Sequence, residues 1–87
     1  MRQVRRAACG LALLLTAACG GQSLECKKYL DCANAVSDGA GDALASKYGT
    51  QGSCWSTSQE AADACTRTCK AAVADVVAAG NAPKACQ

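Results

Sequence analysis

Cysteine is the residue type in this sequence with the greatest capacity for chemistry, and the chain of 87 residues contains eight. Thiols at such spacings can bind a metal ion as thiolates or oxidise in pairs to disulfides. Cys65 and Cys69 lie one helical turn apart and could bind a metal together with Cys26 and Cys32. The export signal described below favours disulfides over a metal site. A redox role is disfavoured because the spacing is not the Cys-x-x-Cys of thiol oxidoreductases.

Other residue types that carry catalysis are few. The sequence contains no histidine, which is the usual general base near neutral pH and the commonest metal ligand. A serine or cysteine nucleophile would therefore need another base. The acidic residues fall mainly on predicted polar helix faces and in turns: Glu25, Asp31, Asp38, Asp42, Glu60, Asp63 and Asp75. We therefore expect a non-enzymatic protein with no metal or other cofactor.

The first eighteen residues have the composition of a secretory signal peptide. Arg2, Arg5 and Arg6 form a basic head, and residues 7–18 are uncharged and rich in leucine. A membrane-spanning helix needs about 20 apolar residues, and this run is shorter. We therefore expect residues 1–18 to be a leader for export.

Cys19 directly follows this run, after the small residues Thr16, Ala17 and Ala18 and before Gly20. This stretch resembles the lipobox of bacterial lipoprotein precursors, although Thr16 stands where leucine is commonest. The resemblance implies that the Cys19 thiol receives a diacylglycerol and that the leader is cleaved just before it. It further implies an exported protein held at a membrane by its lipid. By the same resemblance, glycine rather than aspartate at position 20 implies the outer membrane of a double-membraned cell, facing the periplasm or the cell surface.

The number of cysteines bears on how the leader is removed. Loss of the leader removes Cys9 and leaves seven cysteines, an odd number. If Cys19 carries a lipid, six remain that can pair. Ordinary signal-peptidase cleavage after Ala18 is the alternative, and it would release a freely secreted effector such as a toxin, inhibitor or signal.

The mature part is a small domain of nearly balanced charge. Removing the three leader arginines from nine basic residues leaves six, against seven acidic residues. This balance gives no support for nucleic-acid binding, which needs a clustered basic face. We expect residues 19–23 to be the lipidated cysteine and a flexible tether, and residues 24–87 to be one domain. A domain of this size, without phenylalanine, depends on disulfides because its hydrophobic core is small.

Hydrophobic periodicity predicts an all-α fold with three helices, over about 24–37, 42–48 and 58–79. The predicted apolar stripe of the first helix consists of Cys26, Tyr29, Leu30, Ala33 and Val36. The second helix should end at Gly49, with Leu44 and Tyr48 turned inward. Glycine, asparagine and proline after residue 79 should end the third helix.

The third helix should begin with a capping box formed by Thr57 and Glu60. Its predicted inner face consists of Ala62, Cys65, Cys69, Ala72, Val73 and Val76. No segment alternates between apolar and polar residues as a half-buried strand would.

Six cysteines allow fifteen disulfide patterns, which geometry can rank. If the first and third helices are antiparallel, the favoured pattern joins Cys26 to Cys86, Cys32 to Cys69 and Cys54 to Cys65. The rival pattern joins Cys26 to Cys69, Cys32 to Cys65 and Cys54 to Cys86. Its last bridge would require nearly extended flanks on both sides of a helix about 33 Å long.

Trp55 is the only tryptophan, and it follows Cys54 in a predicted turn. It should pack against the start of the third helix. If it were exposed, it would instead be an anchor for a partner, because interface energy concentrates in residues such as tryptophan. We expect the partner to be an envelope protein or a surface component.

Overall fold

The computed structural model describes residues 21–87, and within this range the fold is entirely helical. The elements are α2 (Leu24–Val36), α3 (Ala40–Tyr48), the single 3-10 turn η2 (Ser53–Trp55), α4 (Gln59–Ala79) and the 3-10 turn η3 (Lys84–Cys86). The prediction of a small all-α domain with three helices is confirmed. The predicted leader and the predicted lipid site at Cys19 lie outside the described residues.

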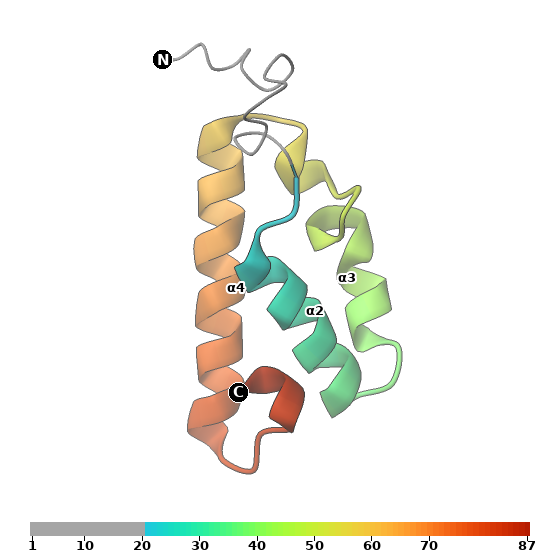
Figure 1. Ribbon diagram of the computed structural model, residues 1–87, viewed down its shortest axis with the longest axis vertical. Helices are drawn as coiled ribbons and strands as arrows, with labels where there is room; N and C mark the ends of the chain where they lie inside the picture. Colours follow the sequence, from blue (N-terminus) through green and yellow to red (C-terminus); the bar gives the residue numbers. More distant parts are fainter. Residues whose placement is uncertain (1–20) are drawn as a thin grey trace.

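Helix α2 is the central element, because it packs against α3, α4 and η3 (Figure 1). Figure 1 also shows that α2 and α4 run in the same general direction, whereas α3 runs the opposite way. After α4 the chain turns back, so that η3 lies against α2. The antiparallel arrangement of the first and third helices, on which the favoured disulfide pattern depended, is therefore wrong.

The turn between α2 and α3 is held by a side chain of α2. Gly39, with φ of 84°, precedes α3 and has no side chain to cap it. The Asn34 Oδ1 atom accepts hydrogen bonds from the backbone N–H groups of Gly41 at 2.7 Å and Asp42 at 3.2 Å. These are donors that the first turn of a helix leaves without a helical partner. Helix α3 thus begins at Ala40, two residues earlier than expected.

The start of α4 differs from the prediction by one residue. Ser58 is the N-cap, and its Oγ atom accepts a hydrogen bond from the backbone N–H of Ala61 at 3.0 Å. Thr57 instead donates its hydroxyl to the carbonyl of Ser53 at 3.0 Å. The predicted capping box of Thr57 and Glu60 is therefore wrong, because the Thr57 hydroxyl is hydrogen-bonded to the preceding 3-10 turn, η2, instead of to the start of α4.

Cysteines make up most of the core. Buried apolar side chains form two clusters, one of Cys26, Tyr48, Cys54 and Cys69 and one of Cys32, Val73 and Cys86. The predicted inner face of α4 is confirmed, since all six of its residues are buried or half-buried. On α2, Val36 does not follow the predicted apolar stripe, because its side chain is 57% exposed. It is the last residue of the helix, where the chain turns away towards α3.

Candidate functional site

Three disulfide bonds form the chemically distinctive part of the domain. They join Cys26 to Cys69, Cys32 to Cys86 and Cys54 to Cys65. Of these pairs, Cys54–Cys65 belongs to the favoured pattern and Cys26–Cys69 to the rival pattern. The predicted pairs of Cys26 with Cys86 and Cys32 with Cys69 are wrong, as are the rival pairs of Cys32 with Cys65 and Cys54 with Cys86.

The course of α2 between its neighbours explains the observed pattern. Cys26 and Cys32 are six residues apart, which places them about 120° apart around a helix. Cys26 therefore meets α4 at Cys69, whereas Cys32 meets the returning chain at Cys86. The two bridges fasten α2 on two different sides.

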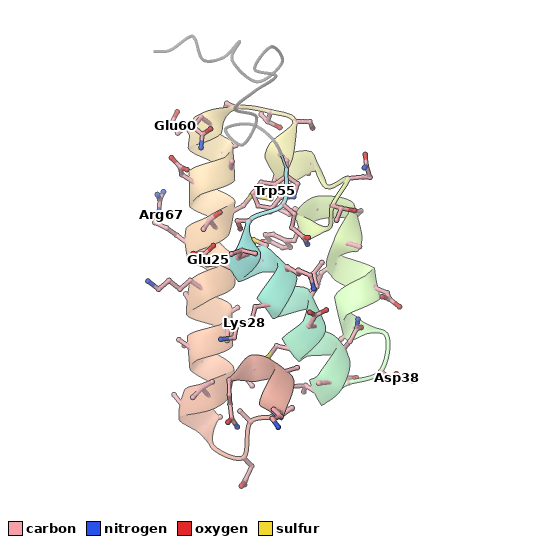
Figure 2. All side chains as sticks on the ribbon, viewed as in Figure 1. Glu25, Lys28, Asp38, Trp55, Glu60 and Arg67 are labelled. Carbon is pink, nitrogen blue, oxygen red and sulfur yellow. A yellow bond between two sulfur atoms is a disulfide. The ribbon has the colours of Figure 1, made fainter. Side chains whose placement is uncertain are left out.

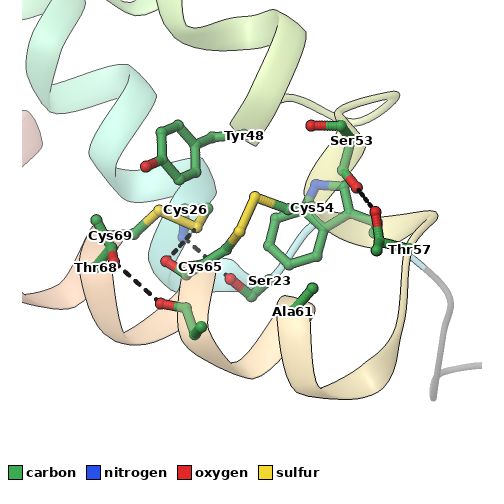
Figure 3. The surroundings of a disulfide bond; sticks show 12 residues. Ser23, Cys26, Tyr48, Ser53, Cys54, Thr57, Ala61, Cys65, Thr68 and Cys69 are labelled. Atoms are coloured by element: carbon green, nitrogen blue, oxygen red, sulfur yellow. Dashed lines mark hydrogen bonds between the residues drawn. A yellow bond between two sulfur atoms is a disulfide. The ribbon is translucent and has the colours of Figure 1, made fainter.

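Two of the bridges leave α4 from consecutive turns (Figure 3). The Cys26 Sγ atom lies 3.4 Å from the carbonyl oxygen of Cys65, so the two disulfides are close neighbours. Cys26 and Cys69 are 0% exposed, and Cys54 is 3% exposed. Cys65 is only half-buried, which makes its bridge the most accessible of the three.

Trp55, like Cys65, packs against the buried cluster that contains Cys54. Its indole is half-buried, and Nε1–H donates to the carbonyl of Gly49 at 2.7 Å. The ring of Tyr48 lies on the other side of this cluster, with its edge against Tyr29 at a centroid distance of 5.6 Å. The structure thus gives Trp55 a packing role, which was the favoured interpretation, rather than a fully exposed position.

Metal binding by Cys26, Cys32, Cys65 and Cys69 was the less favoured alternative, and these cysteines do not form such a site. All six sulfurs in residues 21–87 are bonded to another sulfur, so none of them offers a thiolate for ligation. In the same range, no three His, Cys, Asp or Glu side chains are grouped as metal ligands.

The charged side chains lie on the surface (Figure 2). All seven carboxylates are exposed, as expected from the sequence. Lys27 pairs with Asp31 one turn along α2 at 3.2 Å, and both side chains are more than half exposed. Such a pair contributes little to stability. The described carboxylates thus show no enclosed pair of the kind that acid–base catalysis uses.

The chain entering the domain is hydrogen-bonded to it. The Gln22 Nε2 atom donates to the carbonyl of Tyr48 at 3.0 Å, which attaches the entering chain to the end of α3. The Ser23 Oγ atom accepts from the backbone N–H of Cys26 at 3.3 Å and caps α2. Gln22 and Ser23, which we expected in the tether, are therefore part of the folded domain. The sequence could not show the contact of Gln22, because its partner lies 26 residues away.

Comparisons with known proteins give no relative from which a function could be taken. No family model matches the chain, and neither a curated protein nor a solved structure matches it. Of the helices in residues 21–87, none has the length and apolarity to cross a membrane. The cysteines and the surface of the domain are therefore the features that bear on function.

Proposed function

We propose that this chain is an exported, non-enzymatic lipoprotein of the cell envelope, in which acyl chains on Cys19 anchor a small disulfide-stapled helical module. The observation that carries the proposal is the pairing of all six cysteines in residues 21–87 among themselves. Disulfides of this kind form and persist in oxidising compartments outside the cytosol. Their closure leaves no cysteine in the domain for Cys19 to pair with.

The surface of the domain supports a role in binding or structure rather than catalysis. The sequence has no histidine, and every carboxylate of the domain is exposed to solvent. The module would therefore present its surface to another component of the envelope, at the outer membrane as Gly20 indicates. The anchor would keep that surface close to the bilayer.

Substitution of the two cysteines outside the domain tests the anchor. Cells expressing the chain are given a labelled fatty acid, and the protein is recovered by detergent partitioning. We expect label and detergent-phase recovery for the unaltered chain and for Cys9→Ser, which is the matched control. Cys19→Ser should abolish both. The intact mass should correspond to a chain that begins at an acylated Cys19 and gains six hydrogens on reduction, two for each bridge.

Two outcomes would overturn the proposal. One is an unmodified chain beginning at Cys19 in the culture fluid, which would instead identify a freely secreted effector. The other is a label that persists in Cys19→Ser, which would place the lipid on a different residue.

A further inference from the structure

The connection between α3 and α4 forms a surface without charge, which we call the uncharged loop (residues 48–59). It lies between Lys47 and Glu60 and is the longest stretch of residues 21–87 without an acidic or basic residue. Its exposed side chains carry hydroxyl or amide groups: Thr50, Gln51, Ser53, Ser56, Thr57, Ser58 and Gln59. The loop is therefore suited to a partner rich in hydrogen-bonding groups rather than to one of opposite charge.

Residues 21–23, which lead into α2, lie beside this loop (Figure 1). Gln22 is hydrogen-bonded to the carbonyl of Tyr48, the first residue of the uncharged loop. Only two residues separate Cys19 from Gln22, so that even a fully extended chain spans about 10 Å. A lipid on Cys19 would consequently bring a bilayer to this end of the domain and not to the other.

The charged groups lie away from the loop or at its margin. Asp38 lies at the far end of α2, and Lys84 begins η3, where the chain returns after α4 (Figure 2). Glu60 lies in the first turn of α4, at the edge of the loop (Figure 2). Placing the loop against lipid would therefore remove few charges from water, and burying an unpaired charge is the main cost of such a contact.

We propose that the uncharged loop is a membrane-docking surface, which rests on the headgroups of the bilayer that holds the Cys19 lipid. This inference rests on the proposed function. Four residues of the loop already make side-chain hydrogen bonds within the domain: Ser56, Thr57, Ser58 and Gln59. The Thr50 and Ser53 hydroxyls and the Gln51 amide of the uncharged loop are therefore the groups that bind the phosphate and ester oxygens of the lipids. Helix α4 then leads away from the membrane, and η3 with the end of α4 is the part presented to the envelope space.

The orientation can be measured without relying on lipidation in the cell. In residues 19–87 with the three bridges closed, Cys19 is the only thiol, so it can be coupled to a maleimide lipid in phosphatidylcholine nanodiscs. Circular dichroism and a thiol assay confirm that the domain is folded before coupling. With a paramagnetic headgroup lipid, we expect amide NMR signals of residues 48–59 to be attenuated several-fold more than those of residues 76–87.

Two variants show whether docking, rather than tethering alone, sets the orientation. Thr50→Glu with Gln51→Glu adds charge to the loop, and in nanodiscs containing phosphatidylglycerol it should remove most of the difference in attenuation. Ala78→Glu with Ala85→Glu adds the same charge to exposed positions at the opposite end of the domain, within residues 76–87. This variant should preserve the difference in attenuation. Even attenuation over the whole unaltered domain would overturn docking, as would stronger attenuation of residues 76–87. Either result would leave acylation of Cys19, tested by labelling, unaffected.

Discussion

Gly41 of α3 lies directly against the backbone carbonyl of Leu30 in α2, in a space that excludes any side chain. A Cβ atom built at Gly41 would collide with that carbonyl and would lie 2.8 Å from the Cγ atom of Asn34. The closest approach of the two helices and the cap of α3 thus occur at the same place, because Asn34 Oδ1 also accepts from the Gly41 N–H.

We expect Gly41→Ala to destabilise the domain, although alanine is the better helix former. Propensity alone would favour alanine by about 1 kcal/mol. Overpacking a close contact costs about 1–3 kcal/mol, and here the obstacle is partly backbone, which cannot rotate away. Urea denaturation should therefore show a net loss of stability. Ser46→Ala, at an exposed position of the same helix, is the control and should change stability little. An increase in the midpoint for Gly41→Ala would contradict the close contact.

The cap supplied by Asn34 leads to a second prediction. Asn34→Ala removes the acceptor of two backbone N–H groups, and the one at Gly41 belongs to a buried residue. Loss of an N-cap side chain costs about 0.5–2 kcal/mol, and we expect a value in the upper half of that range. Asn34→Asp keeps the acceptor oxygen and should retain part of the stability. Equal losses in the two variants, measured by urea denaturation, would show that the acceptor is not what matters.

The start of α4 can be tested with two adjacent hydroxyl residues. Ser58→Ala removes the acceptor of the Ala61 N–H and should cost about 1 kcal/mol. Thr57→Ala removes only an exposed hydroxyl that donates to the Ser53 carbonyl, so we expect a smaller loss. Thermal unfolding of both variants gives the comparison. The reverse order of stability would restore the capping box that the sequence predicted.

The buried face of α4 was easier to predict from the sequence than that of α2. The spacing of Cys65, Cys69 and Val73 on α4 predicted most of its inner face, although Ala61 and Thr66 are also half-buried. Helix α2 has neighbours on more than one side. Its buried residues therefore do not form the single apolar face that helical periodicity predicts for an amphipathic helix. The six-residue separation of Cys26 and Cys32 was the available signal, because two such cysteines cannot share one face.

The disulfide pattern was mispredicted for a related reason. Both connections, from α2 to α3 and from α3 to α4, reverse the chain, so α2 and α4 run in the same direction. The prediction that the first and third helices are antiparallel left out the reversal of the chain that α3 introduces between them. The caps by Asn34 and the contact of Gln22 were also missed, since they join residues of different elements and have no signature within one helix. The Cys54–Cys65 pair was predictable because it spans only 11 residues.

The three bridges should differ in what their removal costs. In the chain-entropy view, a bridge over 11 residues stabilises by about 3 kcal/mol, and bridges over 43 or 54 residues by about 4 kcal/mol. Cys54→Ala with Cys65→Ala should therefore leave a folded domain of lower stability and should alter mainly Trp55 fluorescence.

Removal of the longest bridge should be more damaging. Cys32→Ala with Cys86→Ala deletes the pair that holds η3 against α2, and both of its cysteines are only 1% exposed. We expect a larger loss in urea denaturation than for the Cys54–Cys65 pair. Complete reduction should abolish cooperative unfolding, because the remaining core has so few buried apolar residues besides the cysteines. A fully reduced chain that kept its helix content and still melted cooperatively would show that the helices pack without their bridges.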